Sequence, residues 1–233
     1  MNQVPDVFGQ ALRDYFQGQY AEPLLLHTSY GAIEEMPIAT FFRTAPDQPD
    51  LERRALELCQ GKVFDIGAGV GSHALELEKM GLDVTAIDQS RGAVQIMQER
   101  GLKKVLCGHI QSYETKDLYD TLLLMMNGIG LAGKLIELKP LLWHLKSFLK
   151  PGGQLLFDSC DITYLYQEQQ VPFDRYYGEV DYRYEYKNHK GAWFRWLFVD
   201  QQTLKREARA AGWRTEIIYQ DELDQYLAQL TAI

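Results

Sequence analysis

A glycine-rich turn between two apolar segments constrains this chain more than any other feature. Residues 63–71 read Val-Phe-Asp-Ile-Gly-Ala-Gly-Val-Gly, and the apolar run that follows the next helical pattern ends at Asp88. Because glycine lacks a Cβ, such a turn can adopt positive φ angles and lets a ligand approach the backbone closely. An apolar strand, a glycine turn, a helix and a second strand ending in an acid predict a nucleotide-binding βαβ unit.

The details of the turn indicate which nucleotide it would bind. Gly67, Gly69 and Gly71 fall at every second position, and Ser72 stands where a dinucleotide fingerprint has its third glycine. Asp65 precedes the turn, and its carboxylate would repel a pyrophosphate at the helix N-terminus. S-adenosylmethionine carries an ammonium and a sulfonium and no phosphate, so it suits this turn better than a dinucleotide.

Three segments then resemble motifs of the class I S-adenosylmethionine-dependent methyltransferases. Residues 65–71 are similar to the family's first motif, 84–90 to its second-strand acid, and 149–157 to the loop and strand after its fourth helix. The resemblance covers roughly residues 50–220 and implies an α/β fold. Its core is a Rossmann-like, doubly wound, mostly parallel seven-stranded sheet whose last strand is antiparallel. The resemblance also implies direct methyl transfer by SN2 displacement, and it does not name the acceptor.

The order of elements agrees with such a sheet and adds an N-terminal cap and an extra β-hairpin strand. Alternating strands and helices predict a parallel sheet covered on both faces. Residues 1–49 are expected to form a helical cap or lid, starting with a helix over 6–17, and residues 50–233 the cofactor-binding domain of a single globular unit. Strands are expected at 62–66, 82–87, 104–107, 119–126, 154–158 and 213–219, and a hairpin is expected from strands at 174–187 and 192–199. Helices are expected at 50–59, 72–80, 91–100, 134–149 and 201–211. Asp50 is expected to cap the first of these helices and Ser90 the third.

The carboxyl ends of the parallel strands predict where the cofactor binds. Asp65 is expected to hold the ammonium, unless it only shapes the turn, and Asp88 to accept hydrogen bonds from the ribose hydroxyls, unless it is a plain helix acid. Arg43 is expected to pair with the cofactor carboxylate or to lie on the surface. The expected cofactor-binding residues are Asp65, Gly67, Ala68, Gly69, Gly71, Asp88, Gln89, His109, Ile110, Met126 and Arg43.

The adenine end of this set departs from the family pattern. The family often has an acid where this chain has His109, whose ring would stack or accept a hydrogen bond, or would be structural. Ile110 is expected to cover the adenine face and Gln89 to touch its edge. Met126 is expected to face the methyl donor, because it ends the fourth strand.

The acceptor side is harder to predict. Amino-methylating branches of the family often carry Asn or Asp followed by Pro-Pro-aromatic, whereas Asn127-Gly-Ile-Gly lacks both prolines, which argues against an adenine-N6 or glutamine-amide acceptor. Weak catalytic candidates are Asn127, Asp158 and Tyr20; Asp158 would be a general base, although helix capping by Ser159 or Asp161 explains this segment as well.

Aromatic residues crowd the segment 176–196. They would either wall an apolar or cationic substrate pocket or pair across a β-ribbon. Because alternation places only half of them on any one face, we expect most to be structural.

Composition limits the partners. The net charge of −8 over 233 residues argues against a nucleic-acid partner, and three distant cysteines without a CxxC motif indicate neither a disulfide framework nor a metal site. The start lacks the pattern of a signal peptide and the apolar runs are too short to span a bilayer, so no membrane partner and a cytoplasmic protein are expected. The prediction is a methyltransferase acting on a small-molecule acceptor as a monomer or homodimer. A non-catalytic S-adenosylmethionine-binding protein and an NAD(P)-dependent oxidoreductase remain as alternatives.

Overall fold

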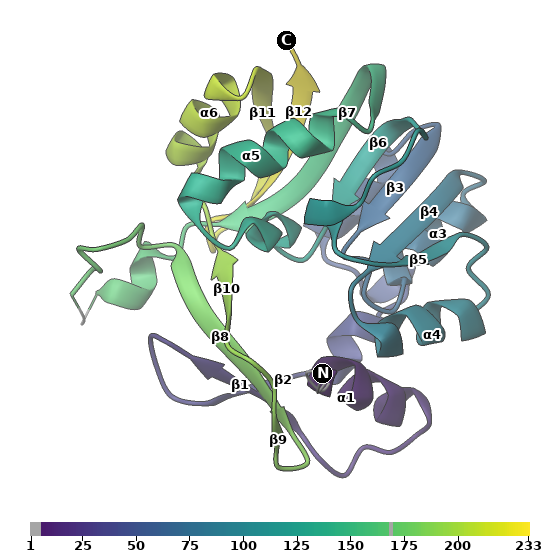
Figure 1. Ribbon diagram of the computed structural model, residues 1–233, viewed down its shortest axis with the longest axis vertical. Coiled ribbons are helices and arrows are strands. Elements are labelled where there is room, and N and C mark those ends of the chain that lie inside the picture. Colours follow the sequence, from purple (N-terminus) through teal and green to yellow (C-terminus); the bar gives the residue numbers. More distant parts are fainter. Residues whose placement is uncertain (1–5, 168–169) are drawn as a thin grey trace.

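The computed structural model describes residues 6–167 and 170–233 and contains two β-sheets that face each other (Figure 1). The central sheet has seven strands in the order β11-β12-β7-β6-β3-β4-β5. Its strands are β3 (Lys62–Ile66), β4 (Asp83–Asp88), β5 (Val105–Cys107), β6 (Tyr119–Leu124), β7 (Leu149–Cys160), β11 (Trp213–Gln220) and β12 (Gln225–Ala232). β12 pairs antiparallel with both of its neighbours, and the other pairings in this sheet are parallel. The predicted Rossmann-like sheet with an antiparallel last strand is confirmed.

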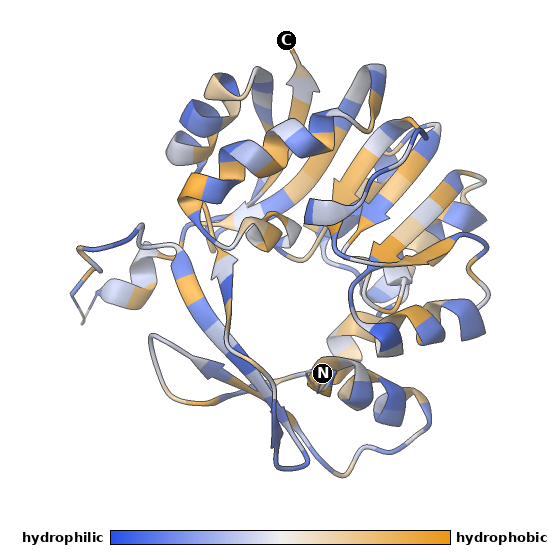
Figure 2. Ribbon diagram, in the orientation of Figure 1, coloured by the Kyte–Doolittle hydropathy of each residue, from blue (hydrophilic) through white to orange (hydrophobic). Residues whose placement is uncertain are grey.

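Helices cover both faces of the central sheet because its strands are apolar on both sides. Phe64 and Leu122 point to one core with α5 and α6, whereas Val63 and Leu123 point to another with α2, α3 and α4. The helices are α2 (Asp50–Leu58), α3 (Ser72–Lys79), α4 (Arg91–Glu99), α5 (Leu135–Lys146) and α6 (Gln201–Ala210). Figure 2 shows the resulting concentration of apolar residues in the central strands.

The second sheet is antiparallel, in the order β10-β8-β1-β2, with β9 paired to β8. It joins segments from opposite ends of the chain: β1 (Leu24–Thr28), β2 (Glu34–Met36), β8 (Glu179–Tyr186), β9 (His189–Lys190) and β10 (Phe194–Leu197). The predicted hairpin therefore forms, but it belongs to this sheet, and the N-terminal cap segment contributes two strands that the sequence did not predict.

Helix α1 (Val7–Phe16) lies between the second sheet and α4. The Asp6 carboxylate accepts hydrogen bonds from Gly9 N (2.8 Å), Ser90 Oγ (2.8 Å) and Gly92 N (3.0 Å), so it links the start of α1 to the start of α4. The two helices approach closely because neither contact position carries a side chain: a Cβ on Gly92 would lie 2.5 Å from the Gly9 carbonyl oxygen.

Several expected boundaries were wrong. The chain continues after β11 into β12, which the sequence analysis did not predict and which occupies the place next to β7. Asp50 is the first residue of α2 and does not cap it, since the N-cap is Pro49. Strand β6 ends at Leu124 and not at Met126, and α5 ends at Lys146 and not at residue 149. The Ser90 cap is confirmed, because its Oγ accepts a hydrogen bond from Ala93 N.

Candidate functional site

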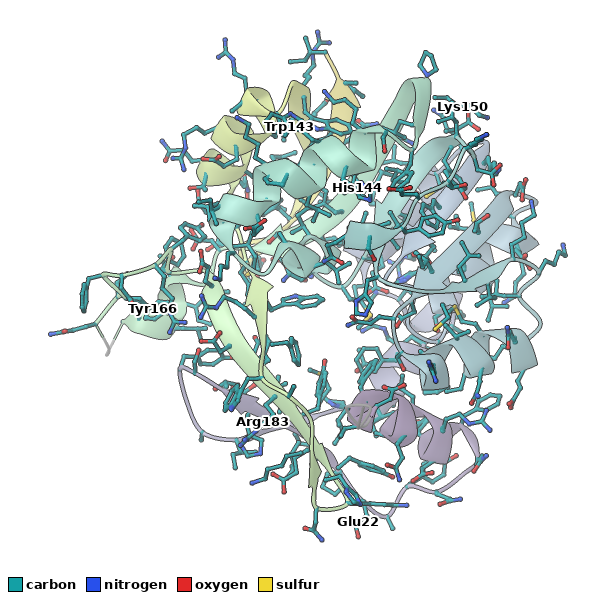
Figure 3. All side chains as sticks on the ribbon, viewed as in Figure 1. Glu22, Trp143, His144, Lys150, Tyr166 and Arg183 are labelled. Atoms are coloured by element: carbon teal, nitrogen blue, oxygen red, sulfur yellow. The ribbon has the colours of Figure 1, made fainter. Side chains whose placement is uncertain are left out.

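A cavity of about 1190 Å³ lies between the carboxyl ends of the central strands and the second sheet. Its walls come from three parts of the chain: the loops after β3, β4, β5 and β6, the N-terminal segment, and one face of the second sheet. Figure 3 shows side chains of both sheets extending toward this space. The cavity thus occupies the crevice where open α/β sheets bind their ligands.

The glycine turn after β3 forms one edge of the cavity. Gly67, Gly69 and Gly71 all have positive φ angles, of 73°, 55° and 79°. Gly67, Ala68 and Gly69 line the cavity, but Gly71 does not. A Cβ on Gly71 would lie 2.4 Å from Leu102 Cδ1, so this glycine allows close packing at the start of α3.

Asp65 places a buried carboxyl group at the end of β3. The residue is 1% exposed, lines the cavity, and its Oδ2 has no hydrogen-bond partner among the described residues. Burial raises the pKa of Asp65 to about 6, the nearby charge of His73 opposes this, and Asp88 adds to it. Since an unpaired buried carboxylate is costly, the site is suited to a ligand that brings a positive group to this oxygen.

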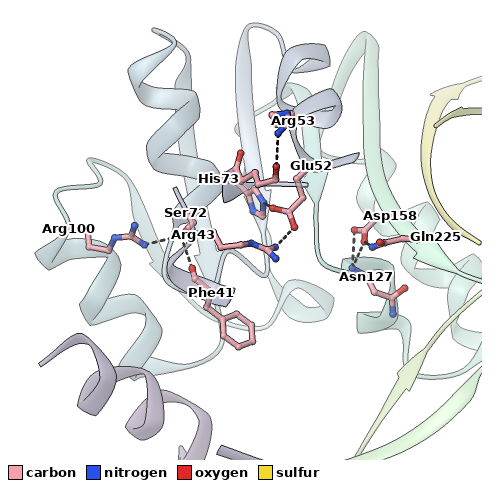
Figure 4. A network of polar contacts seen from close by, with 11 residues as sticks. Phe41, Arg43, Glu52, Arg53, Ser72, His73, Arg100, Asn127, Asp158 and Gln225 are labelled. Carbon is pink, nitrogen blue, oxygen red and sulfur yellow. Dashed lines mark hydrogen bonds and ion pairs between the residues drawn. The ribbon is translucent and has the colours of Figure 1, made fainter. Parts of the chain in front are cut away.

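A second polar cluster contains Arg43, Glu52 and His73 (Figure 4), and its His73 is close enough to Asp65 for their charges to interact. Glu52 is paired with the Arg43 guanidinium and with His73 Nε2, the latter at 2.9 Å. Burial acts to lower the pKa of His73, but the hydrogen bond to Glu52 and the charge of Asp65 raise it above its usual value. Gln48 is 3% exposed and lines the same cavity. Its amide nitrogen and oxygen, and Arg43 Nε, lack partners within the described chain.

These unpartnered atoms match the two ends of an amino acid. Asp65 Oδ2 can accept from an ammonium group, while Arg43 Nε and the Gln48 amide nitrogen can donate to a carboxylate. Of these residues, Asp65 and Arg43 were predicted from the sequence. Gln48, Glu52 and His73 were not predicted, because they belong to no recognisable motif and reach the site only through the fold.

Asp88, at the end of β4, is held by backbone donors. Its Oδ2 accepts from Gly69 N and its Oδ1 from Ser90 N, both at 2.8 Å. Burial raises the pKa of Asp88 to about 6, and these hydrogen bonds oppose the rise. Gly108 N donates to the Asp88 carbonyl oxygen, which ties the end of β5 to the same place. Both oxygens keep a further lone pair for hydroxyl donors in the cavity.

The expected adenine-binding residues lie on the same side of the cavity. Gln89, His109 and Ile110 all line it, next to Asp88. Ile110 is 4% exposed, and its carbonyl oxygen lies 2.8 Å from His144 Nε2, so its backbone is fixed. The structure therefore brings an apolar side chain and an imidazole together beside the Asp88 carboxylate.

The end of β6 has a strained backbone. Met126 and Asn127 adopt φ angles of 60° and 56°, a region that non-glycine residues rarely occupy. The strain is supported by Asp158, whose two oxygens each accept from Asn127 N at 2.9 Å. The Asn127 side chain accepts from Ser159 Oγ (2.8 Å) and donates to the Leu197 carbonyl oxygen (3.1 Å). Its amide therefore joins the two sheets.

The three catalytic candidates are placed differently. Asn127 and Met126 line the cavity, whereas Asp158 is 1% exposed and holds the backbone behind it. Burial raises the pKa of Asp158 to about 6, against the hydrogen bonds from Asn127 N and Gln225. Tyr20 is 68% exposed and does not line the cavity. Of the expected cofactor-binding residues, the structure brings all except Gly71 to the cavity wall.

Neither a metal-binding cluster of side chains nor a membrane-spanning helix is found among the described residues. Across residues 6–167 and 170–233, no group of three or more His, Cys, Asp or Glu side chains is placed to hold a metal ion. Within the same ranges, no helix has the length and apolar character needed to cross a membrane.

Comparisons with known proteins place this geometry in a family. A family model described as "Methyltransferase domain" matches residues 63–153. A crystal structure of an S-adenosylmethionine-dependent methyltransferase from Bacteroides fragilis, in complex with S-adenosyl-L-homocysteine, is 38% identical, with 97% of this chain and 94% of that chain covered and a TM-score of 0.90. The chain belongs to the S-adenosylmethionine-dependent methyltransferases. A search of curated proteins found no match.

More distant structures share the fold of this methyltransferase. DhpI, in a complex named DhpI-SAM-HEP, is 18% identical, with 96% of this chain and 94% of that chain covered and a TM-score of 0.66. CalS10 from Micromonospora echinaspora, an amino pentose methyltransferase solved with S-adenosylmethionine, is 14% identical, with 79% and 88% covered and a TM-score of 0.53.

S-adenosylmethionine is the cofactor, and the NAD(P) alternative is wrong. The cavity residues fit this cofactor, because Asp65 Oδ2 lacks a partner where an ammonium is needed and Asp88 offers lone pairs for ribose hydroxyls. Arg43 and Gln48 would hold its carboxylate, and Gln89, His109 and Ile110 would surround its adenine. The cofactor supplies a methyl group activated by attachment to a sulfonium.

Two variants separate the two ends of this site. Asp88→Ala is expected to weaken binding of both S-adenosylhomocysteine and 5′-methylthioadenosine roughly tenfold or more, because a hydrogen bond to a charged group is worth about 1.5–3 kcal/mol. Gln48→Ala should weaken only S-adenosylhomocysteine, since 5′-methylthioadenosine lacks the amino-acid end. Calorimetry measures both affinities, with the exposed Asp83→Ala of the same strand as control. Equal losses of both ligands in Gln48→Ala would show that Gln48 does not contact the amino-acid end.

The pKa of Asp65 predicts a pH dependence of cofactor binding. The pKa of Asp65 is about 6, so at a pH below this value its carboxyl group is protonated and no longer attracts the ammonium. The affinity for S-adenosylmethionine should therefore fall as the pH drops through about 6. Asp65→Asn should bind roughly tenfold more weakly at neutral pH, because a charge-assisted hydrogen bond is lost. The affinity of Asp65→Asn should depend less on pH, and its remaining pH dependence should come from protonation of Asp88. An unchanged affinity and profile in Asp65→Asn would remove Asp65 from the ammonium site.

Proposed function

We propose that this methyltransferase acts on a small-molecule acceptor that binds inside the cavity between the two sheets. The observation that carries the proposal is that one cavity is lined on one side by the residues expected to bind the cofactor and on the other side by the second sheet. Its volume of about 1190 Å³ slightly exceeds the roughly 300–1000 Å³ typical of small-molecule sites, which suits a cofactor and a small acceptor together.

The N-terminal segment supports a closed site. Phe8 and Phe41, which line the cavity, contact each other edge to face with ring centroids 5.1 Å apart. Ser72 Oγ donates to the Phe41 carbonyl oxygen at 2.6 Å, which ties this segment to the start of α3. These contacts fix the N-terminal segment along one side of the cavity, and we infer that the remaining space suits a small acceptor better than a macromolecule. The net charge of −8 also disfavours a nucleic-acid acceptor.

Orientation is the main contribution we expect from the protein. Asp65, Arg43 and Gln48 would fix one end of the cofactor and Asp88 the other, which leaves the reacting centre between them. The backbone of Met126 and Asn127, held by Asp158, forms a rigid wall beside it. Holding two reactants in line accelerates a displacement without covalent catalysis. A monomer or homodimer and a cytoplasmic location remain predictions.

A fractionated acceptor screen tests this function. The protein is incubated with S-adenosylmethionine and either the small-molecule or the macromolecular fraction of a cell extract, and release of S-adenosylhomocysteine is measured. We expect release with the small-molecule fraction, and much less from Asp65→Asn. Release with the macromolecular fraction alone would overturn the small-molecule proposal. Cofactor binding without release from either fraction would favour a non-catalytic binding protein.

A further inference from the structure

The second sheet separates its side chains by charge. Along β8 and β10, Tyr182, Tyr184, Phe194 and Trp196 line the cavity. The residues that alternate with them along the two strands are charged and lie on the opposite face: Asp181, Arg183, Glu185 and Arg195. Figure 3 shows Arg183 on the side of β8 that faces away from the central sheet. Alternation was expected to place half of the aromatic residues in 176–196 on any one face, and these four are the ones that face the cavity.

The charges of the outer face are paired with one another. Arg195 Nε donates to Asp181 Oδ1 at 2.7 Å, and Arg175 donates to Asp181 Oδ2 at 2.7 Å. Glu185 Oε2 lies 2.6 Å from His27 Nε2. These cross-strand pairs fix the register, and a shift of one residue would exchange the two faces. The aromatic face toward the cavity is therefore specified by the charged face behind it.

The aromatic rings form one continuous surface. Phe194 contacts Tyr182, Tyr184 and Trp196, with centroid separations of 6.0, 5.2 and 6.2 Å. Trp196 Nε1 donates to the Asn127 carbonyl oxygen at 3.1 Å, so the indole is anchored at the end of β6. A Cβ on Gly130 would lie 2.1 Å from Trp196 Nε1, which shows that the loop after β6 leaves room for this ring.

Formal charge is confined to the other walls. The residues of the second sheet that line the cavity are Leu26, Met36, Tyr182, Tyr184, Phe194 and Trp196, and none of these six carries a charge. Burial raises the pKa of Tyr182 and of Tyr184, so both phenols stay neutral at physiological pH. The Asp, Glu and Arg residues that line the cavity come from the N-terminal segment, the central sheet and the helices α2 and α4: Asp6, Arg43, Glu52, Asp65, Asp88 and Arg91. An anionic acceptor against the aromatic wall would be buried without a counter-ion, which is costly.

We propose that the acceptor is a neutral, planar aromatic molecule whose nucleophile is a nitrogen that needs no deprotonation before attack. This inference rests on the proposed small-molecule function. The nitrogen lone pair forms the new N–CH3 bond while the C–S bond breaks, and the electron pair of that bond stays on sulfur. The positive charge thus moves from sulfur to the acceptor, where the faces of Phe194, Trp196 and Tyr182 stabilise a cation. The second sheet offers no carboxylate or imidazole on this wall, and this reaction needs none.

Binding of two matched probes tests the acceptor class. Isoquinoline, a neutral bicyclic ring with a nitrogen lone pair, and isoquinoline-5-carboxylate are titrated by calorimetry into the protein saturated with S-adenosylhomocysteine. We expect isoquinoline to bind at least roughly tenfold more tightly, because the carboxylate would be buried without a partner. Equal or tighter binding of the carboxylate, or no binding of isoquinoline to the S-adenosylhomocysteine complex, would overturn the inference.

Two variants locate the binding. Phe194→Leu keeps an apolar side chain and removes the aromatic ring, and it should weaken isoquinoline binding roughly threefold to tenfold, as expected for loss of an aromatic contact. Trp193→Leu is the control, because Trp193 is 52% exposed and does not line the cavity. Affinity for S-adenosylhomocysteine should be unchanged in both. Unchanged isoquinoline affinity in Phe194→Leu would contradict the aromatic wall.

The two proposals fail in distinguishable ways. If isoquinoline binds as expected but neither fraction of the acceptor screen supports turnover, the small-molecule function fails and the aromatic wall remains as a binding surface. If small molecules are methylated but the carboxylate probe binds better than isoquinoline, only the acceptor class is wrong.

Discussion

The buried carboxyl group of Asp65 is the constraint on which the rest of the site depends. Asp65 is the second-last residue of β3 and is buried, and one of its oxygens has no partner among the described residues. Such a group is tolerated only if its charge is balanced, here in part by His73, or supplied with a cationic ligand. Glu52 in turn balances His73 and Arg43, so a chain of alternating charges lies where we propose that the amino-acid end of the cofactor binds. This electrostatic arrangement explains why a sulfonium cofactor, and not a pyrophosphate, suits the turn.

The two sides of the cavity differ in charge and polarity. The central sheet provides the carboxylates of Asp65 and Asp88 to the cavity wall, and the second sheet provides an uncharged aromatic surface. Asn127 joins the two sides of the cavity. Its side-chain amide donates to the Leu197 carbonyl oxygen, its backbone carbonyl oxygen accepts from Trp196, and its backbone N–H donates to Asp158. A polar bound cofactor and an apolar bound acceptor would thus meet at a backbone that hydrogen bonds hold rigid.

Short sequence patterns predicted the cofactor side of the fold. Strand β3, the glycine turn that follows it, and the acids Asp65 and Asp88 could be predicted because steric and electrostatic rules act there within a few residues. The second sheet could not be predicted in the same way, since β1 pairs with β8 from the other end of the chain. Which aromatic residues face the cavity depends on that register. Gln48 and Glu52 carry no motif, and only tertiary folding brings them next to Asp65.

A crystal structure of the protein with S-adenosylhomocysteine tests the central claim most directly, namely that one cavity has a polar cofactor half and a separate aromatic half. The ligand should lie along the ends of β3, β4 and β5, with its amino group at Asp65, its carboxylate near Arg43 and Gln48, and its ribose at Asp88. The space against Phe194 and Trp196 should stay free of it. A ligand stacked on those two rings, or one that leaves Asp65 without a partner, would contradict this account.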